Sequence, residues 1–207
     1  MNQVAQSRVE SPLDKLKCDT AALHKAVERH LPFPASYEST ESYARVLGVF
    51  HRFQLQVAAY TARYGSQVAA QLALTRRNRL PLIERDMRRL GIGTETACDN
   101  TANRPSLLLT SLDEFYGCLY VSEGSTLGGN IIQKAMLKMH GKTALEWTHY
   151  LNPYGQQIFP MWQTFRSVLN EEIATGNVAL EEVTKGAIKS FDYILETAKT
   201  CGFSEKP

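Results

Sequence analysis

The stretch Leu119–Lys134 reads LYVSEGSTLGGNIIQK and lies inside a run whose apolar residues otherwise recur at helical spacing. It contains three glycines within six residues, Gly124, Gly128 and Gly129. A glycine in a helix interior costs roughly 0.5–1 kcal/mol relative to alanine, so another feature must compensate for these three. Because glycine has no Cβ, a flat ligand or another helix can lie directly against the backbone. We therefore expect a glycine-broken helix that presents this face to a ligand or a packing partner.

The composition indicates one globular domain rather than a nucleic-acid-binding or membrane protein. The 207 residues carry a formal net charge of +2, and 43% of them are hydrophobic. This length and composition suit a single domain with a sizeable core. No broad basic excess favours nucleic acid, and no apolar run approaches membrane-spanning length. We interpret the short basic run of Arg76, Arg77 and Arg79 as a solvated helix face.

The N-terminal sequence and the cysteines together predict the cellular compartment. The N-terminal sequence MNQVAQSRVESP has no apolar segment of the kind found in signal peptides. The four cysteines are scattered and form no C-x-x-C pair, so neither a zinc site nor a redox pair is indicated. Together these features predict a cytoplasmic protein with reduced cysteines.

Helix start and stop signals recur along the chain and predict an all-α, single-domain fold. Ser11 followed by Pro12 is a typical helix start, and Gly65 is a typical helix end. No alternating apolar pattern with hairpin turns predicts a strand pair. Residues 1–10 are expected to form a flexible segment, 11–202 the helical domain and 203–207 a tail. The seven or eight expected helices lie within residues 11–31, 40–64, 67–74, 80–90, 105–139, 143–149, 158–175 and 177–201, with a loop at 92–104.

His24 is the strongest candidate for a metal ligand. It lies one helical turn before Glu28, so the two side chains are neighbours on one helix face. A carboxylate that holds one ring nitrogen, directly or through water, orients the other nitrogen toward a metal. The alternative is a satisfied structural histidine. Glu146 and His149 form one E-x-x-H pair, which we interpret as chance because a di-iron bundle needs two such pairs.

One histidine and one glycine-rich helix together favour haem as the ligand. Haem needs a single axial imidazole if its sixth iron position is to stay open for oxygen, and its flat face needs close backbone. Its two propionates attract cations at the mouth of a pocket. Lys17 lies two turns before His24 on the same helix face, and Arg166 lies on a later expected helix. The alternative for both cations is an ordinary solvated surface charge.

Two segments of the chain resemble the haem oxygenase family. Residues 13–33, LDKLKCDTAALHKAVERHLPF, resemble its proximal helix, with His24 in the iron-ligand position and Glu28 one turn later. Residues 120–136, YVSEGSTLGGNIIQKAM, resemble its kinked distal helix, whose glycines lie over the haem. The variant E-G-S-T-L-G-G resembles the bacterial branch, which includes enzymes that supply bilin to bacteriophytochromes. The resemblance extends over most of the chain, from about residue 13 to residue 195.

This resemblance implies a haem-oxygenase-like helical bundle in which haem is both substrate and cofactor. It implies oxidative opening of haem to biliverdin, carbon monoxide and ferrous iron, with O2 and external electrons. The sequence has no nucleotide-binding motif, so a ferredoxin or a separate reductase would donate the electrons. A bilin-accepting phytochrome is a further expected partner.

The resemblance also assigns roles to individual residues. His24 would be the proximal iron ligand, and Glu28 would accompany it. The three glycines would form the distal wall, with two of them shaping the oxygen pocket most directly. The positions assigned in this way are Gly124, Gly128 and Gly129 for the wall, Gly124 and Gly128 for the oxygen pocket, and Lys17 and Arg166 for the propionates.

Ser125 departs from the family pattern. Many members, especially the animal ones, have an aspartate directly after the first glycine, where it organises the distal waters. A serine hydroxyl can hold a water but is a poorer anchor for charge. We therefore expect the distal proton network to be built differently, and water bound to backbone carbonyls near the glycines is one candidate.

Two other functions remain open at this point. A thiamine-degrading or cofactor-oxidising enzyme of the same helical architecture would need a nucleophilic cysteine or an acidic pair in its core, and Cys118 is a weak candidate. A helical module that binds haem without turnover would need the same histidine and the same glycines.

Overall fold

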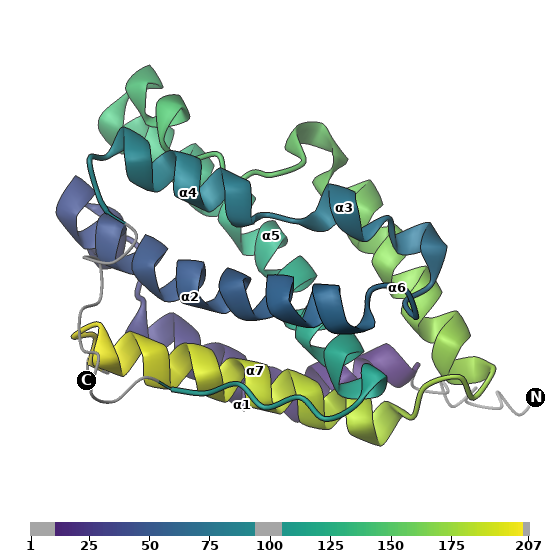
Figure 1. Cartoon of the computed structure of the whole chain (residues 1–207). Helices are drawn as coiled ribbons and strands as arrows, with labels where there is room; N and C mark the ends of the chain where they lie inside the picture. Colours follow the sequence, from purple (N-terminus) through teal and green to yellow (C-terminus); the bar gives the residue numbers. More distant parts are fainter. Residues whose placement is uncertain (1–10, 94–104, 205–207) are drawn as a thin grey trace, which may run out of the picture.

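The computed structural model describes residues 11–93 and 105–204, and these residues form an all-α fold (Figure 1). They contain six α-helices of ten or more residues, one four-residue helix and four short 3-10 turns, and no strand. The prediction of an all-α fold is therefore confirmed. The expected segment 1–10, most of the expected loop 92–104 and the last three residues of the expected tail lie outside the described ranges. The α-helices are α1 (Pro12–His30), α2 (Thr40–Tyr64), α3 (Leu74–Arg77), α4 (Leu80–Arg89), α5 (Leu112–His140), α6 (Ile158–Ala174) and α7 (Leu180–Thr200).

Serine side chains start three of the long helices. Ser11 caps α1 and forms a capping box with Asp14, in which each side chain bonds to the other residue's backbone. Ser39 caps α2 in the same reciprocal way with Ser42. Ser111 caps α5, where its hydroxyl accepts a hydrogen bond from the backbone N–H of Glu114. These caps satisfy backbone donors that a helix start otherwise leaves without partners.

The expected start of α5 at residue 105 is wrong. Residues 105–110 are not helical, and Leu107 and Leu109 are buried. The hydroxyl of Tyr60 donates to Leu107 O and accepts from Leu109 N, both at 2.8 Å, so a side chain of α2 satisfies this backbone in place of a helix. The predicted start of the last helix is also early, because α7 begins at Leu180.

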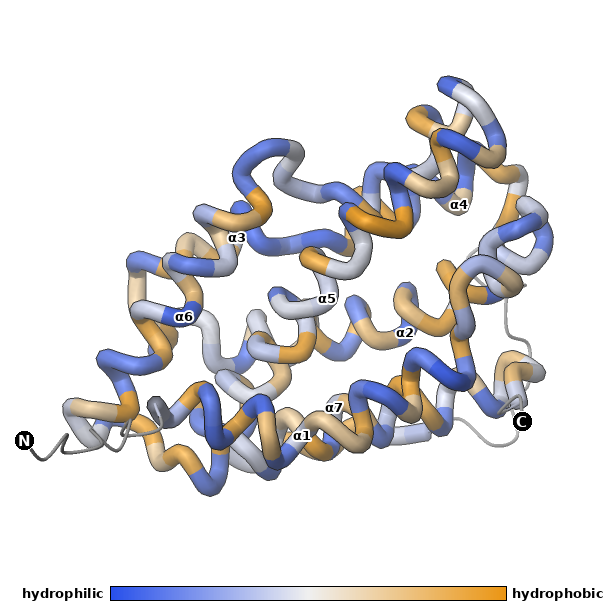
Figure 2. The backbone as a smooth tube through the Cα atoms, turned by 180° about the vertical axis from the view of Figure 1, so that it is seen from behind, coloured by the Kyte–Doolittle hydropathy of each residue, from blue (hydrophilic) through white to orange (hydrophobic). Residues whose placement is uncertain are grey.

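The long helices pack in layers around α5. In Figure 1, α1 and α7 lie along one side of the molecule, α2 lies above them, and α4 lies beyond α2. α5 crosses this arrangement and packs against α2, α6 and α7. Figure 2 shows hydrophilic and hydrophobic residues alternating along the helices, as expected for amphipathic helices that each turn one face inward.

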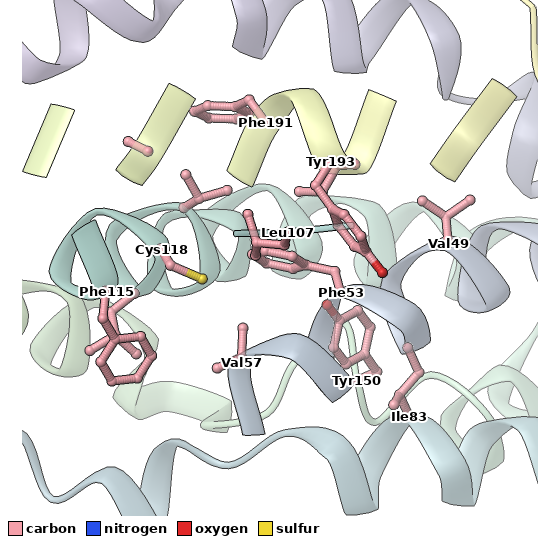
Figure 3. Packing of buried hydrophobic residues seen from close by; sticks show 14 of the residues in the cluster. Val49, Phe53, Val57, Ile83, Leu107, Phe115, Cys118, Tyr150, Phe191 and Tyr193 are labelled. Carbon is pink, nitrogen blue, oxygen red and sulfur yellow. The ribbon is translucent and has the colours of Figure 1, made fainter. Parts of the chain in front are cut away.

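The core lies where α2, α5 and α7 meet. Phe53 of α2 and Phe115 of α5 are almost completely buried, and the rings of Phe53 and Tyr193 lie 6.5 Å apart (Figure 3). Cys118 of α5 belongs to the same buried cluster. Burial of this apolar surface is the main force that holds the helices together.

The α5–α7 crossing depends on two glycines. A Cβ added to Gly186 would overlap the backbone carbonyl of Glu114, and one added to Gly117 would overlap the backbone of Val183. The two helix backbones therefore touch directly at this point. This contact fixes the position of α5, on which the site described below is built.

The cysteine prediction needs one correction. Cys18 and Cys118 are free thiols, but Cys201 is disulfide-bonded. Disulfides are rare in reducing compartments, so the cysteines no longer support a cytoplasmic location. None of the helices in residues 11–93 and 105–204 combines the length and apolar character needed to cross a bilayer.

Replacing Gly186 with alanine should destabilise the protein, whereas replacing Gly128 should not. The added methyl at Gly186 meets the α5 backbone, and overpacking of this kind costs about 1–3 kcal/mol of unfolding free energy. At Gly128 no atom lies within 4 Å of an added Cβ, so alanine should gain about 0.5–1 kcal/mol from helix propensity. Urea unfolding of both variants measures the difference. Equal stabilities would contradict the direct backbone contact between α5 and α7.

Candidate functional site

A cavity of about 1030 Å³ opens among α1, α5, α6 and α7. Its size lies at the upper end of the roughly 300–1,000 Å³ that is usual for small-molecule sites. It brings together every site residue that the sequence analysis singled out, although these residues come from three helices far apart in the chain. The predicted residues that line it are Lys17, His24, Glu28, Gly124, Gly128, Gly129 and Arg166.

His24 presents a half-exposed imidazole to the cavity. Its side chain is 59% exposed, and its Nδ1 lies 3.6 Å from Oε1 of Glu28. This distance is too long for a direct hydrogen bond, but a water can bridge it. The edge of the ring packs against Phe191 of α7, with 5.9 Å between the ring centroids. Phe191 therefore packs against the imidazole, the Glu28 carboxylate lies near Nδ1, and Nε2 has no hydrogen-bond partner in the described part of the chain.

The three glycines of α5 do not have the same surroundings. A Cβ on Gly129 would lie 2.5 Å from Leu151 O, so this glycine is needed for packing against the segment before α6. A Cβ on Gly124 would lie 3.7 Å from the ring of Trp162, and one on Gly128 would have no neighbour within 4 Å. Helix packing therefore explains Gly129. Gly128 faces open space, and a side chain at Gly124 would begin in ordinary van der Waals contact with Trp162.

α5 runs through its glycines without interruption. The helix is continuous from Leu112 to His140, so the expected break in the helix is wrong. The hydroxyl of Ser125 donates to Ser122 O, and that of Thr126 donates to Glu123 O, both at 2.7 Å. Back-bonding of this kind satisfies the side chains within the helix and often bends it. Unbroken backbone hydrogen bonding explains how α5 tolerates glycines that expose its backbone to the cavity.

Two cations that have no ion-pair partner among residues 11–93 and 105–204 line one part of the cavity. Neither Lys17 nor Arg166 forms an ion pair with another described residue. Both are close enough to Asp14 to help lower the pKa of its carboxyl, although hydrogen bonds from Ser11 are the larger cause. The shared influence on Asp14 places the two cations at the same end of the cavity. That end attracts anionic groups of a ligand.

Arg77 is buried behind α5, contrary to the prediction of a solvated helix face. It is 4% exposed, and its guanidinium forms an ion pair with Glu123 of α5, which is 1% exposed. It also donates to Met161 O at 3.1 Å, and Glu123 accepts a hydrogen bond from the hydroxyl of Tyr154 at 2.9 Å. The pair ties α3, α5 and α6 together next to Gly124.

Arg79 is buried even more deeply, at 1% exposed. Its Nη2 donates to Ser122 Oγ at 2.6 Å, and its Nη1 lies 3.3 Å from Ser125 Oγ. Its guanidinium also lies over the ring of Tyr150, 5.2 Å from the centroid. Arg79 thus contacts Ser125, which itself lines the cavity.

The helical interpretation of the basic run failed because burial alternates along it. Arg77 and Arg79 are buried, whereas Arg76 and Asn78 are exposed. Residue 78 has an extended backbone and separates α3 from α4, so every second side chain points inward. The signal that could have revealed this burial is Glu123, an acidic residue inside an otherwise uncharged glycine-rich stretch.

The remaining histidines do not extend the site. Nδ1 of His149 lies 2.9 Å from Asp86, whose carboxyl is fully buried, and burial raises the pKa of that carboxyl. His51 lies 3.7 Å from Glu84. Among the residues that the structure describes, no group of three His, Cys, Asp or Glu side chains could hold a metal ion. His149 thus has a partner other than Glu146, the acidic residue of its E-x-x-H pair.

Comparison with known proteins agrees with this fold. The family described as Heme oxygenase matches residues 11–199. Crystal structures of the NO- and CO-bound heme oxygenase from Neisseria meningitidis match with a TM-score of 0.70 and 22% sequence identity, covering 95% of this chain and 95% of that one. At this identity the structural match shows the fold alone. No curated protein sequence matches the chain. Because the family match spans most of its length, the chain belongs to the haem oxygenase family.

Proposed function

We propose that this member of the haem oxygenase family opens haem to biliverdin, carbon monoxide and ferrous iron, using O2 and electrons from an external donor. Family membership supports haem degradation in general. The observation that carries the finer proposal is that one cavity contains a half-exposed imidazole, a bare stretch of helix backbone and two unpaired cations. A flat, anionic, iron-containing ligand needs all three features.

The residues of the cavity fit haem. His24 Nε2 would bind the iron, and Glu28 would hold the opposite side of the ring in the orientation that this requires. Lys17 and Arg166 would pair with the propionates and set how the haem is rotated in its plane. When bound, haem supplies the iron that takes up O2 and the ring that is oxidised.

The glycine face of α5 has a steric role in this proposal. Gly124 and Gly128 leave room for backbone to approach the haem face that His24 does not occupy. With haem bound, this backbone would leave space for only a small ligand beside it and would exclude most bulk water. Gly129 supports the wall indirectly through its packing on Leu151.

The proposed partners follow from the chemistry. The reaction consumes electrons, and the sequence has no nucleotide-binding motif, so a ferredoxin or a separate reductase is the proposed donor. The pattern E-G-S-T-L-G-G, which resembles the bacterial branch of the family, supports a phytochrome as the proposed acceptor of the bilin product. A cytoplasmic setting stays a proposal, and the disulfide bond of Cys201 means that the cysteines do not support it.

A cysteine-based enzyme of the same architecture finds little support. Cys118 is fully buried in the core and does not line the cavity. Burial raises the pKa of its thiol to about 12, so its nucleophilic thiolate form is suppressed. A module that binds haem without turnover would differ from the proposed enzyme only in that the bound haem is not consumed. Addition of a reductant to the haem complex in air distinguishes the two.

The His24→Ala variant should lose the haem chemistry but keep its fold. Hemin titration of the wild-type protein should give the Soret band of a histidine-ligated haem, and ascorbate in air should convert it to a bilin absorption. The variant should give neither, whereas added imidazole should restore the Soret band. Its unfolding free energy should stay within about 0.5 kcal/mol of wild type, because the His24 side chain is mostly exposed.

A matched control for this variant is His140→Ala, since His140 does not line the cavity. Normal haem ligation in His24→Ala would contradict the ligand assignment. A wild-type haem complex that survives reductant and oxygen unchanged would favour the binding module over the enzyme.

A leucine in place of Gly128 should obstruct the distal side of the haem without unfolding the protein. No atom lies within 4 Å of a Cβ added at this position, but a leucine side chain would extend into the volume proposed for haem and its gas ligand. The measurement is carbon monoxide affinity of the ferrous haem complex, which should fall at least about tenfold, or about 1.4 kcal/mol. Unchanged affinity would show that Gly128 does not face the ligand.

Thiol labelling should separate the two free cysteines. In the native protein an alkylating reagent should modify exposed Cys18 within minutes and leave Cys118 unmodified until the protein is unfolded. Peptide mass spectrometry identifies the labelled residue. Rapid alkylation of Cys118 in the folded protein would contradict its burial and would support a cysteine-based enzyme.

A further inference from the structure

The buried guanidinium of Arg79 forms no ion pair with any carboxylate of residues 11–93 and 105–204. No Asp or Glu of the described residues lies within 4.0 Å of it, and its Nε is buried without a hydrogen-bond partner. The neighbouring Arg77 differs, because its charge is balanced by Glu123. A buried charge without a counterion is costly and is rarely retained for packing alone.

The groups around Arg79 do not cancel its charge. Arg77 and Glu123 neutralise each other. Tyr150 and Tyr154 remain neutral phenols, because burial is the main cause that raises the pKa of each hydroxyl. Hydrogen bonds to Ser122 and stacking over Tyr150 stabilise the guanidinium but supply no negative charge. Arg77, Arg79, Glu123 and these two tyrosines together therefore carry one net positive charge. The nearby carboxyl of Asp86 accepts from Tyr150 N at 2.7 Å and is paired with His149 rather than with Arg79.

Ser125 connects this charge to the cavity. Its hydroxyl donates to Ser122 O at 2.7 Å and accepts from Arg79 Nη1 at 3.3 Å, so two partners fix its orientation. Ser125 itself lines the cavity, whereas Arg79 does not. An aspartate at this position would neutralise the guanidinium, but a serine leaves its charge uncompensated.

We propose that Arg79 gives the cavity wall at Ser125 a positive potential, so that this face binds anionic ligands in preference to neutral ones. The inference rests on the proposed haem site, because haem iron is what would hold a ligand against this wall. Arg79 acts here as a positioning residue through Ser125 rather than by touching the ligand. It would stabilise negative charge that develops on a small ligand held on this side.

The test compares an anionic and a neutral ligand of the ferric haem complex. Azide and imidazole are titrated at about pH 8 and followed by their Soret shifts in the wild type and in Arg79→Met. The variant should bind azide about tenfold more weakly and imidazole with unchanged affinity. Arg76→Met, which removes an exposed charge three residues away, should match the wild type for both ligands. Equal weakening of both ligands, or no change in azide affinity, would overturn the proposal.

A second pair of variants tests the same charge without removing the buried arginine. Ser125→Asp places a carboxylate next to the guanidinium, and Ser125→Asn introduces a side chain of the same size without charge. Azide should bind about tenfold more weakly to Ser125→Asp than to Ser125→Asn, and imidazole equally to both. Equal azide affinities would overturn the inference even if Arg79→Met fails to fold.

Hemin binding by the wild-type protein distinguishes a failure of the proposed function from a failure of the role proposed for Arg79. If the wild-type protein binds hemin through a histidine and the azide comparison fails, the proposed function stands and the role of Arg79 falls. If the protein binds no hemin, the proposed function itself is overturned.

Discussion

The direct backbone contact between α5 and α7 is the constraint on which the site depends. Gly117 and Gly186 let the two helices touch, and this contact holds α5 from one side. The buried pair of Arg77 and Glu123 holds it from another, next to Gly124. With its position fixed in this way, α5 can present bare backbone at Gly128 to a cavity without collapsing into it. The open space is thus maintained by tight packing elsewhere on the same helix.

Charge is distributed unevenly around the cavity, and the pattern suits an anionic ligand. Lys17 and Arg166 lie at one end of the cavity, and neither has an ion-pair partner in the described part of the chain. Both could pair with the propionates of haem. Arg79 lies deeper, behind Ser125, with no carboxylate in contact among the described residues. A solvated cation costs little free energy, whereas a buried cation without a counterion is costly. The two kinds of cation would therefore act at different stages, the first in binding and the second in handling charge at the reacting centre.

Local signals in the sequence predicted most of the helices, because caps such as Ser11 act within a few residues. All seven site residues predicted from the sequence line the cavity. The roles of His24 and of the two cations stay predictions. The predictions that were wrong concern features that depend on contacts between distant segments of the chain. The start of α5 was missed because Tyr60 satisfies the backbone around Leu109. The burial of Arg79 was missed because its partners lie more than forty residues later in the chain.

The central claim is that haem lies between the imidazole of His24 and the bare backbone of α5. A crystal structure of the protein in complex with hemin tests it most directly. The account predicts that Nε2 of His24 is bonded to the iron and that the backbone at Gly124 and Gly128 is in van der Waals contact with the opposite face of the ring. Iron bound to another residue, or haem located outside this cavity, would contradict it.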